Sequence, residues 1–460
     1  MSSLSSHPAA SEVHLPKGPA RSTLWDSLSM ILNPMDFLDQ MRSQYGELFL
    51  VPGFGRFPEV IMVNDPKAIQ QIFTADENTF DSGVGLDLVL PLVGDNSLIL
   101  LDGNRHKQQR KLLMPPFHGE RMRNYGELIC NIADQAIARQ SIGKTFLARE
   151  TMQEVSLETI LRAVFGLKEG DRYQQILQLL TEMLDSFNSP FKSVFLFFKT
   201  LQKDLGPWSP WGNFLRKREL LDRLLYQEIQ ERRAQGNFSG EDILSLLLNA
   251  QDEEGQPMSD VELRDELMTL LFAGHETTAT ALAWALYWLH YRPDVREKLL
   301  QELQSIDIKT SDPTAITRLP YLNAVCSETL RIYPVLFFAF PRVPKQPMPL
   351  VDYQIPEGMM LTICIYLLHH NPEIYPDPKT FKPERFLDRQ YSPYEYIPFG
   401  GGNRRCLGAA FALFEMKLVL ATVMSHYSLE LINPRPIFPA RRGVTFAPAG
   451  DIALRVTQRK

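Results

Sequence analysis

The longest apolar stretch of the chain lies between Ser259 and Tyr291. Its middle is hydrophobic on nearly every face of a helix, which is typical of a helix that is buried in a large protein or crosses a membrane. Ser259 and Glu262 predict a capping box at its start, and Pro293 predicts its end because proline breaks a helix. Glu276 lies at the centre, where an acidic group would be costly inside a membrane. The pattern therefore predicts a long helix through the protein core.

The remaining pattern predicts mostly helices, with a smaller β region. A short helix is expected over 36–45, and a β-hairpin over 47–63, where two β-rich runs flank a Gly/Pro turn. Short strands with Pro/Gly turns are expected over 335–365, and a helical run over 408–426. Further β structure is expected over 427–458, where the tail predicts a closing hairpin.

Composition favours one large globular domain. The chain has 460 residues, of which 44% are hydrophobic and 22% charged, which is ordinary for a soluble protein. The apolar segments are evenly spread, so we expect a single domain over 15–460, after a disordered leader at 1–14. The net charge is −6 and no basic stripe dominates, which argues against nucleic acid as a partner.

The cysteines and the start of the chain indicate a cytoplasmic protein. Four cysteines are too few for a disulfide framework in a chain of this length, so a reducing compartment is expected. The first residues lack the basic region and the apolar run of a signal peptide. They are also too polar for a membrane span, so no transmembrane anchor is expected. A peripheral contact with a membrane surface stays open.

The sharpest local pattern is FGGGNRRCLG, residues 399–408. Its glycine run gives a backbone that can approach a flat ligand closely. Cys406 precedes a predicted helix, whose positive end is expected, with Arg404 and Arg405, to hold the sulfur as a thiolate. A phosphate loop would need the GxxxxGK[ST] spacing, and a cysteine nucleophile would need a triad with histidine. Neither pattern is found, so the residues favour an iron ligand.

This segment resembles the heme-binding loop of cytochrome P450 monooxygenases. That family has the pattern Phe-x-x-Gly-x-Arg-x-Cys-x-Gly, matched here by Phe399, Gly402, Arg404, Cys406 and Gly408. Three more segments resemble motifs of the family and come in its order: AGHETT at 273–278, the ExxR segment at 328–331 and PERF at 383–386. The resemblance covers about residues 15–458, nearly the whole chain.

The resemblance implies a mainly α cytochrome P450 fold with a smaller β region. Its cofactor would be heme b (iron protoporphyrin IX), held between the long central helix and the helix after Cys406, with the Cys406 thiolate as axial ligand. Such a thiolate pushes electron density onto iron and favours cleavage of the O–O bond. Glu276 is expected to deliver protons and Thr277 to hydrogen-bond at the oxygen. The alternative is that Thr277 merely bonds back to a helix carbonyl.

Further residues are expected to hold the cofactor or to shape its pocket. His106 and Arg110 resemble the family's Trp-x-x-x-Arg motif for the heme propionates, with histidine where tryptophan is common. Ala273 and Gly274 are small and are expected to leave room for the porphyrin and dioxygen. The full set of expected cofactor contacts is His106, Arg110, Ala273, Arg342, Phe399, Arg404 and Gly408.

The resemblance also implies a buried network of Glu328, Arg331 and Arg385. Glu328 and Arg331 share one helix face at i and i+3, and the family adds Arg385. For a generic ExxR segment, a solvated ion pair would be the simpler interpretation. In this context we expect a structural network whose disruption would leave an unpaired buried charge.

The expected substrate is an apolar small molecule such as a fatty acid, an alkane or a terpenoid. By resemblance, its contacts should come from apolar stretches near 80–97, 187–198 and 445–446, and specifically from Phe272, Ala339, Phe340 and Phe446. The aromatic-rich segment 187–211 is a core helix with a loop, a mobile aromatic lid over an apolar cavity, or a surface that touches a membrane.

We therefore expect a bacterial-type monooxygenase that uses dioxygen. Because the chain ends soon after Cys406, its electrons are expected from a separate ferredoxin or flavodoxin with its reductase. A heme-thiolate isomerase or peroxide-driven peroxygenase is the second hypothesis, although such relatives often lack the acid–threonine pair kept here. A non-catalytic heme carrier or sensor is the third.

Overall fold

The computed structural model describes most of the chain, namely residues 14–19, 29–30, 32–53, 56–86, 89–117, 120–166, 170–185, 202–236 and 240–460. The leader expected at 1–14 lies outside these residues except for its last position. Most of the aromatic-rich segment 187–211, with its expected lid, also lies outside them.

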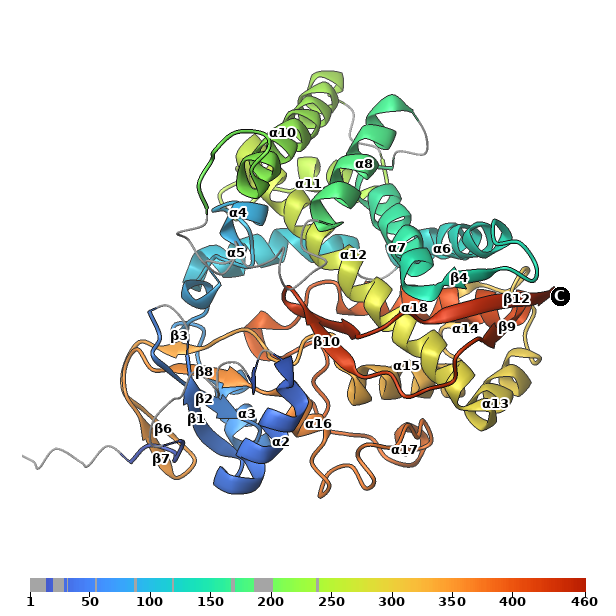
Figure 1. Ribbon diagram of the computed structural model, residues 1–460. Coiled ribbons are helices and arrows are strands. Elements are labelled where there is room, and N and C mark those ends of the chain that lie inside the picture. The colour runs from blue at the N-terminus through green and yellow to red at the C-terminus, as the bar shows by residue number, and fades with distance from the viewer. Residues whose placement is uncertain are drawn as a thin grey trace, which may run out of the picture.

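Helix α12 (Asp260–Tyr291) runs obliquely through the middle of the molecule (Figure 1). The Ser259 hydroxyl accepts a hydrogen bond from the Glu262 backbone N–H, and the Glu262 carboxylate accepts one from the Ser259 backbone N–H, so the predicted capping box is present. Most side chains of α12 are buried. The prediction of a long helix through the core is confirmed.

The other helices surround α12, with α6, α7, α8 and α10 on one side of it (Figure 1). They are α2 (Pro34–Tyr45), α3 (Pro66–Thr74), α4 (Leu90–Val93), α5 (Gly103–Leu113), α6 (Glu120–Ala138), α7 (Ala148–Phe165), α8 (Asp171–Asp185), α10 (Pro210–Gln235), α11 (Ile243–Asn249), α13 (Pro293–Leu303), α14 (Pro313–Ile316), α15 (Pro320–Ile332), α16 (Ile365–His369), α17 (Arg385–Asp388) and α18 (Ala409–His426).

The strands form small sheets, most of which gather with α2 and α3 at one end of the molecule (Figure 1). Strands β1 and β2 form the predicted antiparallel hairpin, and β8 pairs in parallel with β2. The described strands are β1 (Leu48–Pro52), β2 (Glu59–Val63), β3 (Phe80–Asp81), β4 (Thr145–Leu147), β5 (Val343–Pro344), β6 (Met348–Leu350), β7 (Tyr353–Ile355), β8 (Met360–Ile363), β9 (Tyr427–Leu431), β10 (Pro439–Arg442), β11 (Thr445–Pro448) and β12 (Ala453–Arg459).

The tail differs in part from its predicted closing hairpin. Strands β10 and β11 do form a tight hairpin, and Gly443 at its turn has a φ of +59°, which favours glycine. The last strand, β12, pairs instead with β9 and β4. This pairing buries Leu454 and Val456 against the helical core. Burial of these two side chains favours it over a hairpin between β12 and β11.

Helix α18 is long and apolar enough to span a membrane by length and hydropathy. Its residues nevertheless pack into the main core, where Phe411, Leu418 and Val423 are buried. It is therefore a core helix, and it carries the end of the glycine-rich loop into the centre of the molecule.

Candidate functional site

The loop that contains Cys406 lies directly before α18. The Cys406 backbone N–H donates to the Phe399 carbonyl at 2.9 Å, which closes the loop on itself. A Cβ at Gly401 would come within 2.2 Å of the Phe73 ring of α3, and Gly402 has a φ of +63°. The glycine run is therefore required by packing against α3 and by backbone conformation. Close approach to a flat ligand stays a prediction for this run.

Opposing effects act on the pKa of the Cys406 thiol. Helix α18 begins at Ala409, with Gly408 as its N-cap. Burial raises the pKa of the Cys406 thiol, although the Gly408 backbone N–H and the charges of Arg110 and Arg405 favour the thiolate. A bound metal ion would deprotonate a coordinating thiol outright.

A cationic cluster lies beside this loop. Burial, with the positive charges of Arg404, Arg110 and Arg342, lowers the pKa of His106 to about 3, so the imidazole is neutral. Arg342 is 3% exposed, and its hydrogen bonds among the described residues go to backbone carbonyls. Burial and the charge of Arg404 lower the pKa of Arg342 to about 9. Arg404 is paired with Asp102.

This cluster fits a flat group with two negative charges. Three guanidinium groups meet one described carboxylate, that of Asp102, so the site has an excess of positive charge. Buried positive charge of this kind is expected to find anionic partners. The four residues predicted to hold the heme propionates are thus brought together, although Arg404 already uses part of its donors on Asp102 and the Leu98 and Leu101 carbonyls.

The centre of α12 presents a small residue toward open space. Ala273 is exposed although the turns on both sides of it are largely buried. Gly274 faces the other way, since a Cβ there would lie 3.2 Å from the Ile160 side chain of α7. The exposure of Ala273 is compatible with the expectation that it leaves room for the porphyrin and dioxygen. The small size of Gly274 instead serves the close contact with α7.

Glu276 and Thr277 follow on the same helix, and both line a cavity. The Glu276 carboxylate forms an ion pair with Arg149 and accepts a hydrogen bond from Gln153 at 2.7 Å. The Thr277 hydroxyl donates to the Ala273 carbonyl at 2.7 Å. This is the back-bonded geometry named above as the alternative. It leaves the lone pairs of the Thr277 oxygen able to accept a hydrogen bond.

The cavity has a volume of about 440 Å³ and mostly apolar walls. All four residues predicted to contact substrate line it, namely Phe272, Ala339, Phe340 and Phe446. Among its described lining residues, the charged ones are Glu276, Arg441 and Arg442. The two arginines lie at the β10–β11 turn, and the Arg441 Nε donates to the Gly443 carbonyl at 3.1 Å.

Glu328, Arg331 and Arg385 form one buried network. The Glu328 carboxylate accepts hydrogen bonds from Arg331 at 2.7 and 2.9 Å and from Arg385 at 3.2 Å. The side chains of Glu328 and Arg331 are 0% exposed. The solvated ion pair that a generic ExxR segment would suggest is thus not what this segment forms.

The network also reaches the loop that carries the cysteine. Arg331 donates to the His369 carbonyl at 2.7 Å, and the His369 Nε2 accepts the Ile397 backbone N–H at 3.0 Å. Ile397 lies two residues before Phe399, at the entrance to the loop. The buried charges therefore hold the segment from which the Cys406 loop departs.

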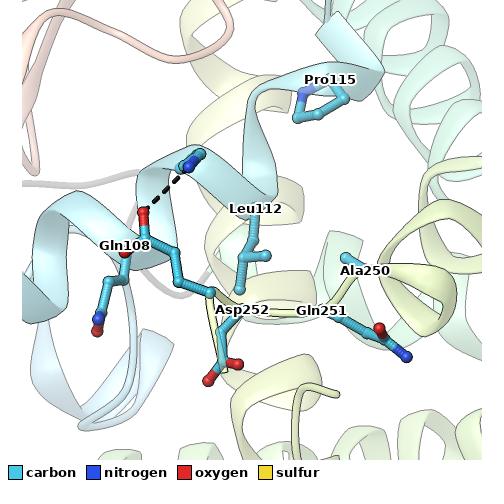
Figure 2. Close-up of a pocket in the computed structure, with 8 residues that line it drawn as sticks. Gln108, Leu112, Pro115, Ala250, Gln251 and Asp252 are labelled. Carbon is cyan, nitrogen blue, oxygen red and sulfur yellow. Dashed lines mark hydrogen bonds and ion pairs between the residues drawn. The ribbon is translucent and has the colours of Figure 1, made fainter. Parts of the chain in front are cut away.

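A second hollow, of about 320 Å³, lies between α5 and the segment before α12. Figure 2 shows Gln108 and Leu112 of α5 on one side of it and Ala250–Asp252 on the other. Lys111 and Glu253, which also line it, form an exposed ion pair with a distance of 3.0 Å between Nζ and Oε1. It shares no lining residue with the larger cavity, so it is separate from the candidate site.

Comparison with known proteins identifies the class of protein. The family model described as cytochrome P450 matches residues 16–452. Cytochrome P450 135B1 of Mycobacterium tuberculosis is 35% identical over 449 residues, which are 97% of this chain and 92% of that protein. Cytochrome P450 138 of the same organism is 33% identical and is covered to 98%. The chain belongs to the cytochrome P450 family.

The solved structures agree with this assignment. The structure titled "Retinoic acid bound cyanobacterial CYP120A1" superposes with a TM-score of 0.83 at 26% identity, covering 98% of this chain and all of that one. The heme domain of cytochrome P450DA superposes with a TM-score of 0.82 at 24% identity, which shows the fold. The expected cytochrome P450 fold is confirmed. The family consists of heme b monooxygenases with an axial cysteine thiolate, so the chain is an oxidoreductase of that class.

Several residues at the site were not predicted from the sequence. Arg149 and Gln153 contact Glu276 but lie more than a hundred positions before it. Asp102, the partner of Arg404, is even more distant in the chain, at 302 positions. Arg441 and Arg442 had a detectable signal, since two adjacent arginines beside Gly443 interrupt a mostly apolar stretch over 436–449.

We predict that Glu328→Gln strongly destabilises the protein. The change leaves two buried guanidinium groups without their carboxylate, which costs about 3–5 kcal/mol. Denaturant unfolding of the heme-loaded protein, with heme content measured in parallel, gives the effect. Glu219→Gln is the control, because its pair with Arg223 is exposed and is worth about 0–1 kcal/mol. Equal stability of the two variants would contradict the structural role of the network.

Proposed function

We propose that this P450 inserts one oxygen atom of dioxygen into a long apolar molecule that carries a carboxylate, such as a fatty acid. The second oxygen atom leaves as water, and the reaction takes up two electrons and two protons. The observation that carries the proposal is the cavity with apolar walls, which is lined by Ala273 and Thr277 of α12 and by two arginines, Arg441 and Arg442. A heme with a thiolate ligand supplies the activation of dioxygen.

In this proposal Cys406 is the axial ligand and the cationic cluster holds the propionates. His106 stays neutral and donates one N–H, while Arg110, Arg342 and Arg404 supply positive charge. Phe399 and Gly408 border the sulfur, since Phe399 anchors the Cys406 backbone and Gly408 turns its N–H toward the sulfur. Ala273 keeps the opposite face of the cofactor clear.

Glu276 and Thr277 are proposed to deliver the protons that the reaction with dioxygen takes up. The Thr277 hydroxyl, fixed by its bond to the Ala273 carbonyl, accepts a hydrogen bond from a group in the cavity. Glu276 lines the same cavity and moves protons from outside with the help of water. Its ion pair with Arg149 has to loosen for that step, so Arg149 acts as a gate for proton entry.

The charge of the cavity favours an anionic substrate over an alkane or a neutral terpene. Arg441 and Arg442 line the cavity at the β10–β11 turn and offer positive charge to an anionic substrate, and the carboxylates that act on Arg442 are those of Glu276 and Asp451. Burial lowers the pKa of both half-buried arginines, and a carboxylate is a suitable charge-assisted partner for a guanidinium group. The relative CYP120A1 was solved with retinoic acid, an apolar molecule with a carboxylate.

We propose that electrons come from a separate ferredoxin or flavodoxin with its reductase, in the cytoplasm. Arg405, the neighbour of Cys406, is exposed and offers positive charge to an acidic protein. Docking there would give a short path to the sulfur. A rate of reduction that does not respond to Arg405→Glu or to salt would argue against this docking face.

We predict that Cys406→Ser removes the thiolate signature from the spectrum of the reduced, carbon-monoxide-bound protein. Serine occupies nearly the same volume but offers a hydroxyl instead of a sulfur to the iron. Cys130→Ser is the control, because this half-buried cysteine lies on α6. A wild-type spectrum in the Cys406 variant would overturn the assignment of the ligand.

We predict that Thr277→Ala keeps the heme but uncouples oxygen use from product. The variant loses the hydroxyl in the cavity, whereas Thr277→Ser keeps it and should retain most of the coupling. Oxygen uptake, peroxide release and product are measured with a ferredoxin and its reductase. Full coupling in Thr277→Ala would refute the proton role of this residue. Wild-type activity with peroxide alone would favour a peroxygenase, and heme binding without any turnover would favour a carrier.

We predict that a long-chain fatty acid binds more tightly than its methyl ester, as measured by the shift in heme spin state. Each charge-assisted contact is worth about 1.5–3 kcal/mol, so Arg441→Gln or Arg442→Gln should raise the Kd of the acid about tenfold or more. The Kd of the ester should hardly change. Arg455→Gln on β12, outside the cavity, is the control. Equal binding of acid and ester would remove the carboxylate from the proposal.

A further inference from the structure

A second buried acid lies behind the turn of α12 that carries Glu276 and Thr277. Glu415 of α18 is 1% exposed, and its Oε1 has no hydrogen-bond partner among the described residues. The Ser156 hydroxyl of α7 is hydrogen-bonded to its side chain. Burial, only partly offset by that hydrogen bond, raises the pKa of Glu415 to about 8. At neutral pH this group is therefore mainly an uncharged carboxylic acid.

Ser156 links this acid to the turn that carries the predicted catalytic residues. The Ser156 side chain is buried, and its oxygen lies 3.5 Å from the Gly274 carbonyl. Gly274 lies between Ala273, which faces open space, and the pair Glu276 and Thr277. The contact is close because Gly274 has no side chain on the face that meets α7.

One hydroxyl proton cannot serve two acceptors at once. If Glu415 were ionised, it would accept from Ser156, and the Gly274 carbonyl would lose this donor. If Glu415 is neutral, its own O–H donates to Ser156, and Ser156 donates onward to Gly274. The three groups then form a chain of hydrogen bonds with one direction, in which each donor has an acceptor.

The same face of α7 contacts this turn at further positions. Arg149, Gln153, Ser156 and Ile160 recur at helical spacing and so lie on one face of α7. Arg149 and Gln153 hold the Glu276 carboxylate, and the Gln153 carbonyl contacts the His275 ring at 3.1 Å. The Ser156 contact completes a surface that fixes the backbone and the side chains of the turn together.

We propose that Glu415, as a neutral acid, is a positioning residue that directs the Ser156 hydroxyl onto the Gly274 carbonyl and so fixes the turn bearing Glu276 and Thr277. The residue does not touch the substrate or the cofactor. Its role deepens the proposed oxygen chemistry and rests on it for the effect on turnover. The protonated state of Glu415 and its bond to Ser156 can be tested without any substrate.

The first test is infrared spectroscopy of the heme-loaded protein at neutral pH. The wild type should show a carbonyl band of a protonated carboxylic acid that disappears in Glu415→Gln and shifts in Ser156→Ala. Glu266 is the matched control for assignment. Glu266 is also a buried acid, but it lies on α12 rather than α18. Its pKa is likewise raised to about 8, and its carboxylate accepts hydrogen bonds from Leu98 and Gln109 rather than from Ser156. If only Glu266→Gln removed a band, the proposal would be overturned.

The second test separates a neutral hydrogen-bond donor from mere filling of space. Glutamine is uncharged and can donate an N–H to Ser156, so Glu415→Gln should keep wild-type coupling. Glu415→Leu and Ser156→Ala cannot form the chain and should release several-fold more peroxide per electron pair. The reduced carbon-monoxide spectrum should stay that of the wild type in all three, which shows that the heme site is intact.

Two outcomes of this turnover test would contradict the proposal. One is a Glu415→Gln variant as uncoupled as Glu415→Leu. The other is a Ser156→Ala variant that is fully coupled, which matters even if Glu415→Leu fails to fold. A failure of the proposed substrate would look different, since the infrared bands would be present while no product formed in the wild type.

Discussion

The carboxylate of Glu328 is the interaction on which the rest of the site depends. It is fully buried and binds two arginines, Arg331 from the next turn of the same helix and Arg385 from a segment more distant in the chain. Through Arg331 it holds the His369 backbone, and through the His369 ring it holds Ile397 at the entrance of the cysteine loop. A loop rich in glycine has little rigidity of its own. Its shape is therefore set by a charge network outside it.

At the turn 273–277, each face of helix α12 meets a different part of the structure. Ala273 and Thr277 face the cavity, Gly274 faces α7, and Glu276 is shared between the cavity and Arg149. A turn with so many polar groups in an apolar helix would be unstable without partners. Helix α7 supplies those partners, so stability and the geometry of the oxygen side come from the same contacts.

The fold and the motif residues could be predicted because they depend on local pattern. The capping box of Ser259, the β1–β2 hairpin and the apolar helix after Cys406 follow from neighbours in the sequence. The residues that line the cavity could be named because they lie in recognised segments. The resemblance thus carried the site further than periodicity alone would have done.

The rest could not be predicted because it depends on contacts between distant segments. Arg149 meets Glu276, Asp102 meets Arg404, and Ser156 meets Glu415 only once the helices have packed. The glycine run shows the same limit, since its need for glycine at Gly401 comes from Phe73 on another helix. Strand β12 also pairs with distant segments, β9 and β4, because this pairing buries its apolar face.

The span of the cavity walls along the chain has a consequence for biosynthesis. The walls include Met30 near one end and Phe446 near the other. Domains fold as they leave the ribosome at about 5–20 residues per second, so this enclosure closes only after the segment with Phe446 has been synthesised. A nascent chain spends on the order of a minute with its apolar lining uncovered. Insertion of the porphyrin is therefore a late event, and any product truncated before the last hairpin would be a client for chaperones rather than an enzyme.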